Sequence, residues 1–506
     1  MKTYKLYLVL LIFAFSCTSK QHKKEVPVSK PNIIIIYADD LGFGDIGING
    51  AKGVKTPNID FLAENGINHL DAHCSAATCT PSRYSLLTGS YAFRNKAEVL
   101  PGDAPLIINP NKETLPSMLQ KGGYKTAVIG KWHLGLGRGK VDWNKEITPG
   151  PKEIGFDYSF LIPATGDRVP CVFVENQQVL GLNPDNPIEV NYLEKLDGYP
   201  IGLENPDDLK QKSDPQHSQT VINGISRIGY MSGGEEALWK DENFPFVLTD
   251  KAKHFITENK KNPFFLYFAF HDIHVPRAPN KKFVGKSSMG PRGDAIAQMD
   301  WCVGELINHL KKSKLLENTL VIFTSDNGPI LNDGYKDKAV ELLGSHKPAG
   351  IYKGAKYSIY EAGTRMPTIV FWPGNIKPGK SSAMLNQVDL FASLASLTGG
   401  KLSEEFAPDS ENHLDAWLGK SNNGREIMIE EAFTLALRKG NWKYIEPQER
   451  PTPDWLVNKE VETGLMTTPQ LFNLDDDPEE TKNIASEFPE KVEEMRNALN
   501  EIKRKQ

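Results

Sequence analysis

Four short apolar runs, each followed at once by polar or charged residues, constrain the fold more than any other feature of the chain. The runs cover residues 33–37, 126–130, 264–270 and 320–325, and a fifth covers 368–372. Continuous runs rich in β-branched and aromatic residues are typical of strands buried on both faces, as in a mostly parallel sheet.

Helical patterns lie between these runs. Residues 56–66 open with Thr-Pro and close with glycine, residues 114–123 open with Thr-Leu-Pro and also close with glycine, and residues 294–312 form a long amphipathic pattern. This alternation predicts an α/β fold, a large mixed, mostly parallel sheet sandwiched by helices. Ligands of such sheets bind beyond the carboxyl ends of the strands. Four of the predicted strands end there in side chains that bind metal or transfer protons.

The character of the sequence changes near Pro408. Short β-like runs at 426–431, 435–440, 442–446 and 470–474 precede a helical pattern at 489–503. We therefore expect a smaller C-terminal antiparallel sheet with a helix, and divide the chain into a catalytic domain, 31–405, and a C-terminal subdomain, 406–506. Residues 166–246 are polar and rich in proline and glycine, which predicts long loops over the active-site face.

The N-terminus has the pattern of an export signal. Lys2 and Lys5 precede an apolar run that is too short to span a bilayer, and Cys17 follows it. Residues 1–17 therefore read as a lipoprotein-type signal peptide with lipidation at Cys17, and residues 18–30 as a tether; the alternative is a plain signal peptide. We expect a periplasmic or cell-surface protein that meets the membrane only through a lipid anchor. The net charge of −5 argues against nucleic-acid binding.

Paired oxygen donors follow two of the predicted strands. Asp39-Asp40 come after the first run, and Asp326-Asn327 come after the run at 320–325. Taken singly, such residues often cap turns or helices. Because both pairs stand at strand ends, together they predict a site for a hard cation such as Ca²⁺ or Mg²⁺.

Cys79 opens the segment Cys79-Thr80-Pro81-Ser82-Arg83, which reads as a helix start with proline in the first turn. A helix N-terminus favours an anion, and Arg83 adds a bidentate cation. The competing interpretation is a buried cysteine in front of a capped helix. Three further segments supply candidates for anion binding and proton transfer: Lys131 with His133, His271 with His274, and Lys356 in a glycine-containing loop.

Taken together and in their order along the chain, these segments resemble the formylglycine-dependent sulfatases of the arylsulfatase type, within the alkaline phosphatase superfamily. Cys-Thr-Pro-Ser-Arg followed by Leu86-Leu87-Thr88-Gly89 is similar to the family's signature, and Gly130-Lys-Trp-His-Leu-Gly is similar to its second signature. The resemblance runs from about Pro31 to Gly374 and is weaker beyond.

The resemblance implies that a maturation enzyme oxidises Cys79 to formylglycine (3-oxoalanine), whose hydrate attacks the sulfate ester. It also implies one Ca²⁺ per chain and a role for each matching residue. The metal ligands would be Asp39, Asp40, Asp326, Asn327 and residue 79. The groups that bind the sulfate, support the leaving group or transfer protons would be Arg83, Lys131, His133, His274 and Lys356.

The substrate is a sulfated carbohydrate by this resemblance, with exo action on a galactose- or N-acetylgalactosamine-type sugar as the working hypothesis. Candidates for lining its pocket are Thr165, Asp167, Arg168, His217, Arg277 and His346. Two alternatives remain open. One is a phosphoesterase or phosphonate hydrolase of the alkaline phosphatase superfamily, and the other is a glycan-binding lipoprotein with an unmodified Cys79.

Overall fold

The computed structural model of the chain describes residues 30–401, 406–457 and 459–504. The predicted signal peptide with Cys17, and all of the predicted tether except Lys30, lie outside these residues. Within the described ranges, no helix combines the length and the apolar character that crossing a membrane requires.

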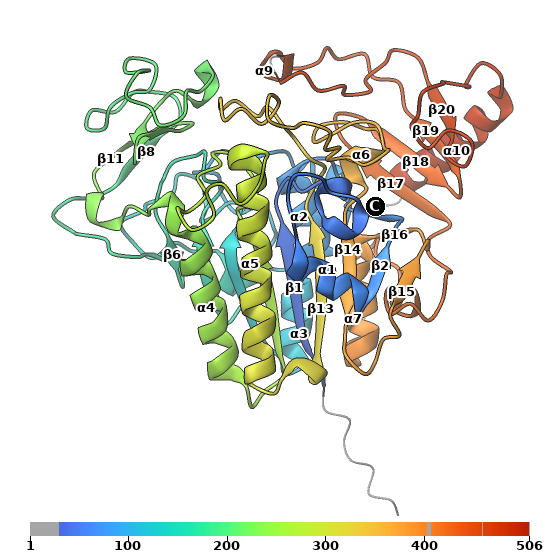
Figure 1. Cartoon of the computed structure of the whole chain (residues 1–506), viewed down its shortest axis with the longest axis horizontal. Coiled ribbons are helices and arrows are strands. Elements are labelled where there is room, and N and C mark those ends of the chain that lie inside the picture. Colours follow the sequence, from blue (N-terminus) through green and yellow to red (C-terminus); the bar gives the residue numbers. More distant parts are fainter. Residues whose placement is uncertain (1–29, 402–405, 458, 505–506) are drawn as a thin grey trace, which may run out of the picture.

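A ten-stranded mixed sheet forms the centre of the molecule (Figure 1). In spatial order its strands are β15 (Gly379–Ser381), β2 (Ile67–His69), β14 (Thr368–Phe371), β13 (Thr319–Ser325), β1 (Asn32–Ala38), β12 (Phe264–Ala269), β4 (Lys125–Lys131), β5 (Tyr158–Ile162), β6 (Val174–Glu175) and β7 (Gln178–Val179). The four runs that end in chemically active residues are the adjacent strands β13, β1, β12 and β4. All four are parallel, and the predicted fold class is confirmed.

Strand β1 fixes the level at which these strands end. Its Tyr37 pairs with Ala269 of β12 on one side and with Thr324 of β13 on the other. The residues that follow the three strands therefore leave the sheet side by side. Gly130 lets β4 join this register, since a Cβ there would lie 1.7 Å from the carbonyl oxygen of Ala269.

The run at 368–372 behaves differently from the other four. Its strand, β14, is antiparallel to both β13 and β2. Its carboxyl end therefore lies at the opposite edge of the sheet from those of β1 and β13. This orientation explains why the run ends in a Pro-Gly turn and delivers no side chain to the site.

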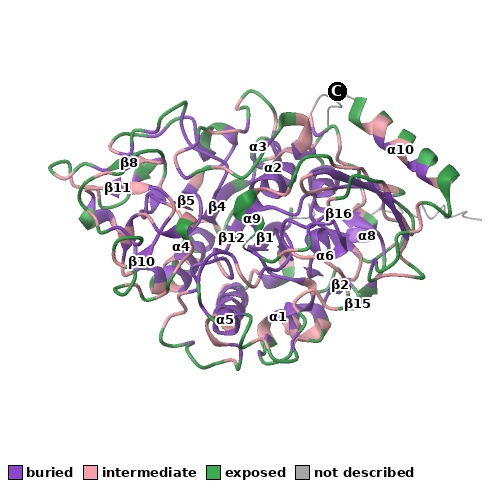
Figure 2. Ribbon diagram, turned by 90° about the horizontal axis from the view of Figure 1, so that it is seen from above, coloured by how far each residue is buried: buried purple, intermediate pink, exposed green. Residues whose placement is uncertain are grey.

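Two layers of helices cover the sheet. One contains α1 (Pro57–Glu64), α4 (Phe244–Asn259) and α5 (Gly290–Lys312), and the other contains α2 (Cys79–Thr88), α3 (Leu115–Lys121) and α7 (Leu390–Thr398). Viewed from above, α1 and α5 lie on one side of the central strands, and α2 and α3 on the other (Figure 2). The apolar side chains of the strands are buried between the two layers, as expected for strands that read as continuous apolar runs.

The C-terminal region forms a separate antiparallel sheet of four strands. They are β17 (Ile427–Glu431), β18 (Leu435–Lys439), β19 (Trp442–Ile445) and β20 (Gln470–Asn473). Helix α10 (Pro489–Arg504) buries Val492, Met495 and Leu499 against this sheet. The predicted small sheet and terminal helix are thus confirmed. Between the two sheets, α8 (Leu414–Trp417) packs against α7.

A buried group of charges, here called the junction cluster, joins the small sheet to the large domain. Its members are Asp71, His73, Glu361, Arg365, Glu430, Arg438, Lys443 and Glu480. Lys443 Nζ lies 2.7 Å from Glu430, 3.1 Å from Glu361 and 3.2 Å from Glu480. Arg438 of β18 also reaches across to Asp71, at 2.7 Å. The small sheet is therefore held in place by ion pairs shielded from water.

Candidate active site

The carboxyl ends of four neighbouring strands bring most of the predicted metal and anion ligands to one place. They are Asp39 and Asp40 after β1, Asp326 and Asn327 after β13, His274 after β12, and Lys131 at the end of β4. Each of these side chains is almost completely buried. We define the active-site cluster as seven of the site's side chains. They are Asp39, Asp40, Asp326, Asn327 and Lys131, together with Arg83 of α2 and Lys356 of the loop before α6 (Glu361–Thr364).

The cluster pairs three carboxylates with three cations. Arg83 donates to Asp326 Oδ2 through Nε (3.0 Å) and Nη2 (2.7 Å). Lys131 Nζ lies 2.5 Å from Asp39 Oδ2, and Lys356 Nζ lies 3.0 Å from Asp40 Oδ1. Burial raises the pKa of Asp39 well above its ordinary value, and the neighbouring Asp326 adds to this effect. The three cations therefore do not fully offset the cost of burying these negative charges close together.

One acceptor in the cluster has no partner. Asn327 donates its Nδ2 to Asp40 Oδ1 at 2.7 Å, whereas its buried Oδ1 accepts no hydrogen bond from any described residue. Ligand atoms of Asp39, Asp40, Cys79 and His274 also lie within 4.8 Å of one another. Crowded carboxylates beside an orphaned amide oxygen are the donors that a hard cation takes, so the residues present fit a calcium ion.

Cys79 is the first residue of α2, and its Sγ lies 4.0 Å from Asp39 Oδ1. The helix begins here because Thr78 is extended and Pro81 is accommodated in the first turn, and it ends at Gly89, which has a φ of 63°. Burial raises the pKa of the Cys79 thiol to about 12, although Lys131 and Lys356 oppose this. An unmodified Cys79 is therefore a neutral thiol at physiological pH and a weak nucleophile.

Two histidines flank the cysteine, and burial lowers the pKa of each well below its ordinary value, so both are neutral. His133 Nε2 lies 2.9 Å from the carbonyl oxygen of Leu100, which assigns its proton to Nε2 and leaves Nδ1 as a lone-pair acceptor. No described residue bonds this Nδ1. By the same argument His274 donates Nδ1–H to the carbonyl oxygen of Val275 at 2.6 Å.

Three residues of the site have left-handed backbone: Asp40, His133 and Tyr357, with φ angles of 59°, 55° and 71°. Such angles are uncommon for residues that carry a side chain, and they cost of order 1 kcal/mol each. Their concentration here indicates that the surrounding structure holds these side chains in one orientation.

Cys79 opens into a cavity of about 190 Å³, here called the cysteine cavity. The predicted residues that line it are Cys79, His133, Asp167, Arg168, His217, His274 and Lys356. Thr165 lies just behind them and accepts a hydrogen bond from Arg168 Nη1 at 2.8 Å. Arg83 and Lys131 do not line this cavity. Arg83 pairs with Asp326 at 2.7 Å and lies 3.9 Å from Asp39, and Lys131 pairs with Asp39, so both lie behind the carboxylates.

One wall of the cavity is built from the loops at 164–246. Arg168 Nη1 lies 2.7 Å from Asp167 Oδ1, and His217 Nε2 lies 3.4 Å from Asp167 Oδ2. Asp214 fixes the other ring nitrogen of His217 at 2.7 Å. Although burial lowers the pKa of His217, the two carboxylates more than offset this and leave it raised. The wall thus presents fixed hydrogen-bonding groups to a polar ligand.

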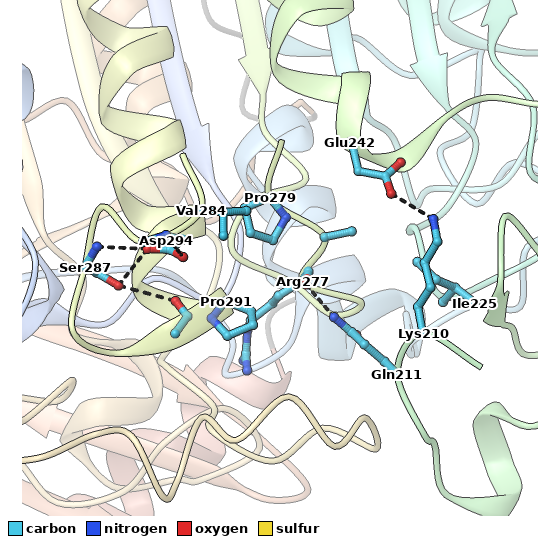
Figure 3. A pocket seen from close by; sticks show the side chains of 13 residues that line it. Lys210, Gln211, Ile225, Glu242, Arg277, Pro279, Val284, Ser287, Pro291 and Asp294 are labelled. Carbon is cyan, nitrogen blue, oxygen red and sulfur yellow. Dashed lines mark hydrogen bonds and ion pairs between the residues drawn. The ribbon is translucent and has the colours of Figure 1, made fainter. Parts of the chain in front are cut away.

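Two of the predicted pocket residues lie elsewhere. Arg277 is bound by the carbonyl oxygens of Ile273 and Ile330, at 3.0 and 2.7 Å, and by Asp337 at 2.8 Å. Figure 3 shows it beside a different cavity, near Gln211. His346 instead pairs with Asp45 at 2.8 Å. Residue type and position favour both as pocket residues, but Ile330, Asp337 and Asp45, which hold these two side chains, come from segments distant in the sequence.

Seven residues that line the cavity were not predicted: Val99, Gln216, Ile228, Asp333, Tyr357, Trp455 and Lys459. Asp333 bridges two lysines, with Oδ2 2.9 Å from Lys356 Nζ and Oδ1 3.1 Å from Lys459 Nζ. Asp333 lies seven residues beyond Asp326, in the loop that follows the same strand, so its nearness to Asp326-Asn327 was a signal that could have identified it. Trp455 and Lys459 belong to the C-terminal region, and nothing in their sequence neighbourhood points to the site.

Comparisons with known proteins agree on one family. A family model described as Sulfatase matches residues 31–400. The chain is 50% identical over 492 residues to an N-acetylgalactosamine-6-O-sulfatase of Bacteroides thetaiotaomicron, covering 96% of both chains. It is 30% identical over 495 residues to arylsulfatase A of Bos taurus, covering 94% of this chain and 87% of the relative.

Solved structures point the same way. One structure, reported in connection with the metabolism of multiple glycosaminoglycans by Bacteroides thetaiotaomicron, matches with a TM-score of 0.92 and 51% identity. The match covers 94% of this chain and 99% of that one. The similarity therefore extends over both sheets and is not confined to the strand ends.

Proposed function

This chain belongs to the sulfatase family, and on that premise we propose that it removes the 6-O-sulfate of N-acetylgalactosamine residues. The broader activity follows from its relatives: the protein is a hydrolase that releases sulfate from sulfated sugars. One observation carries the choice of sugar, namely the 50% identity to an N-acetylgalactosamine-6-O-sulfatase over 96% of both chains.

In this proposal Cys79 acts as formylglycine and Asp39, Asp40, Asp326, Asn327 and residue 79 hold Ca²⁺. When bound, the ion would neutralise charge on the sulfate oxygens and lower the pKa of the attacking hydroxyl. The neutral, buried thiol supports the modification, because the unmodified side chain offers little nucleophilic power at this position. A maturation enzyme is then the required partner.

The remaining residues divide between the sulfate and the protons. Lys131 and Lys356 are proposed to bind sulfate oxygens, and Lys356 to support the departing sugar oxygen. His274 would join Lys356 in this role only with a proton on Nε2, since its Nδ1–H is held by Val275. His133 Nδ1 is proposed to accept the proton of the second hydroxyl on residue 79, which expels sulfate. This role is supported by the unpaired Nδ1 and by the carbonyl of Leu100, which fixes the tautomer.

Asp167, Arg168 and His217 are proposed to bind the hydroxyl groups of the sulfated sugar. They line the same cavity as Lys356, which is proposed to bind the sulfate, and they are held in place by one another and by Asp214. A site built to hydrogen-bond particular hydroxyls discriminates strongly against sugars that place them elsewhere, because its buried polar groups would then lack partners. We further propose export through residues 1–17 and anchoring through Cys17.

The proposal is tested on a panel of defined sugars, with protein co-expressed with a maturation enzyme. N-acetylgalactosamine 6-sulfate should release sulfate faster than the 4-sulfate, and faster than the 6-sulfates of galactose and N-acetylglucosamine. Cys79→Ala should lose activity by about 10⁶-fold, as expected for removal of a nucleophile. The matched control is Cys302→Ala, which removes another buried cysteine, on α5, and should retain activity.

Equal sulfate release by the wild type and Cys79→Ala would refute the role of residue 79. Preference for another sugar of the panel would refute the proposed substrate while leaving the sulfatase activity intact. Mass spectrometry of the peptide that contains residue 79 reports the modification directly.

A further inference from the structure

A second and larger cavity, of about 730 Å³, adjoins the cysteine cavity. The two share Val99, Tyr357 and Trp455 in their walls. The larger one, here called the aromatic cavity, extends from these residues toward the small sheet, where Phe433 and Arg450 line it. Val99, Tyr357 and Trp455 therefore mark the boundary that a ligand occupying both cavities would pass.

Three aromatic rings form the wall where the two cavities meet. Tyr357 and Trp455 lie with ring centroids 5.2 Å apart, Phe433 and Trp455 6.3 Å apart, and Tyr357 and Phe433 6.4 Å apart. They come from the loop before α6, from α9 (Asp454–Val457) and from the turn between β17 and β18. Trp455 remains 38% exposed although it packs against both partners. The faces of such rings bind the apolar C–H face of a sugar ring, while polar groups around them bind its hydroxyls.

The charges around this wall suit a sugar better than a polyanion. Among the described residues that line the aromatic cavity, Lys96 and Arg450 are accompanied by Glu98 and Glu431. Charges of both signs supply donors and acceptors for hydroxyl groups and do not form the cluster of cations that a chain of sulfates would need. The cysteine cavity is also lined by both signs, with Arg168 paired to Asp167 and with Lys356 and Lys459 paired to Asp333, but of the two cavities it is the one that contains a member of the active-site cluster, Lys356.

We propose that the aromatic cavity binds the sugar unit glycosidically attached to the sulfated residue, so that the enzyme prefers oligosaccharides to the sulfated monosaccharide. This inference rests on the proposed function, since it assumes that the sulfated sugar occupies the cysteine cavity. The attached sugar stacks on the wall of Tyr357, Phe433 and Trp455 and lies beneath Arg450. The substrate class is thereby narrowed from a sulfated sugar to at least a sulfated disaccharide.

The test compares N-acetylgalactosamine 6-sulfate with a disaccharide in which the same residue is linked through its anomeric carbon to a second sugar. Wild-type kcat/KM should be about tenfold higher for the disaccharide, the ratio that one good aromatic contact provides. Phe433→Ala should remove most of this preference, measured as the ratio of the two kcat/KM values, because Phe433 lines the aromatic cavity and not the cysteine cavity. Phe433→Leu, which keeps the apolar volume, serves as a second variant if the first is unstable.

Phe488→Ala is the matched control, since Phe488 is a half-exposed phenylalanine of the same region that packs on Trp442 away from both cavities. It should keep the wild-type preference. Equal kcat/KM of the wild type for the two saccharides would overturn the inference, and so would an unchanged preference in both Phe433 variants.

A binding measurement separates this inference from the proposed function. Inactive Cys79→Ala protein, titrated with the same two saccharides, should bind the disaccharide about tenfold more tightly. Equal affinities would overturn the inference whatever the enzyme hydrolyses. If no sugar of the panel is hydrolysed but the disaccharide binds more tightly, the proposed reaction fails while the aromatic cavity stands as a saccharide site.

Discussion

The active-site cluster and the junction cluster are both buried groups of carboxylates and cations, and each contains ligand atoms close enough to hold a metal ion. In the first these belong to Asp39 and Asp40 with the adjoining Cys79 and His274, and in the second to Asp71, His73 and Glu361. Proximity alone does not distinguish the two groups. The difference lies in the neutral acceptor that the active-site cluster keeps unpaired and in the cavity that adjoins it.

In the junction cluster each carboxylate lies against a cation. Arg365 lies 2.6 Å from Glu361 and 2.9 Å from Asp71, Arg438 lies 2.7 Å from Asp71, and Lys443 pairs with Glu430 and Glu480. The carboxylates of the active-site cluster are paired as well, but there the neutral amide oxygen of Asn327 has no partner among the described residues, and the adjoining Cys79 opens into a cavity. The junction cluster is thus a set of charges that neutralise one another, whereas the active-site cluster keeps a neutral acceptor beside a cavity.

The same substitution in both clusters tests this distinction most strongly. Asp40→Asn should lower kcat/KM by about 10³-fold, because it removes a charge from the proposed metal and sulfate site. Its melting temperature without metal should not fall, since burial raises the pKa of Asp40 and the carboxylate is costly there. Added Ca²⁺ should raise the melting temperature of the wild type and not of this variant.

Asp71→Asn is the matched partner of that variant. It should lower the melting temperature and leave activity per folded molecule intact, because Arg365 and Arg438 lose a charged acceptor far from the reacting groups. If Asp40→Asn and Asp71→Asn lose activity to the same extent, the claim that only the active-site cluster serves catalysis is wrong.

A second prediction concerns the centre of the junction cluster. Lys443→Met should destabilise the protein by about 3–5 kcal/mol, because three buried carboxylates lose their shared cation. The measurement is chemical denaturation followed by tryptophan fluorescence. The control, Lys439→Met, removes an exposed ion pair with Glu494 from the neighbouring strand and should cost less than about 1 kcal/mol. Similar losses in the two variants would show that the junction cluster is not a special source of stability.

The smallest expected effect is on pH dependence. Burial raises the pKa of Glu480 to about 8, and Glu361 adds to this, while Lys443 opposes it. The unfolded chain has the ordinary, lower pKa, so the folded state retains this proton more tightly. The resulting stabilisation is complete below the ordinary pKa and is lost as pH rises through 8.

Glu480→Gln should therefore flatten the decline in melting temperature between pH 5 and pH 8 by the equivalent of about 1 kcal/mol. Thermal melts at several pH values measure this. Parallel curves for the two proteins would mean that Glu480 does not titrate in this range.

The strands and the meeting of their ends were predictable from sequence for a physical reason. A strand buried on both faces needs a continuous apolar run, and parallel strands bring their carboxyl ends to one edge of the sheet. Asp39, Lys131, His274 and Asp326 could therefore be placed together without a structure. The antiparallel direction of β14 was not predictable, because its run carries the same apolar signal.

The walls of the two cavities were less accessible to sequence reasoning. Asp333 and Lys459 come from loops and Trp455 comes from the one-turn helix α9. Tertiary contacts set the positions of these segments, and no periodicity in the sequence predicts them. The same limit explains why Arg277 was wrongly expected in the pocket. Arg277 lies just beyond a site histidine in the sequence, but the carbonyl groups that bind it, those of Ile330 and Leu331, lie far along the chain. Residue type and local position identify candidates, but the partners decide where a side chain points.

The paired register of β1 with β12 and β13 has an evolutionary consequence. Main-chain hydrogen bonds set where the strands end, and they are indifferent to the side chains that surround the opening. The segments proposed to contact sugar, around 164–246 and 448–465, can therefore diverge or be grafted from a relative while the reacting groups keep their positions. Transplanting those two segments is a rational route to an enzyme that desulfates a different glycan with the same catalytic centre.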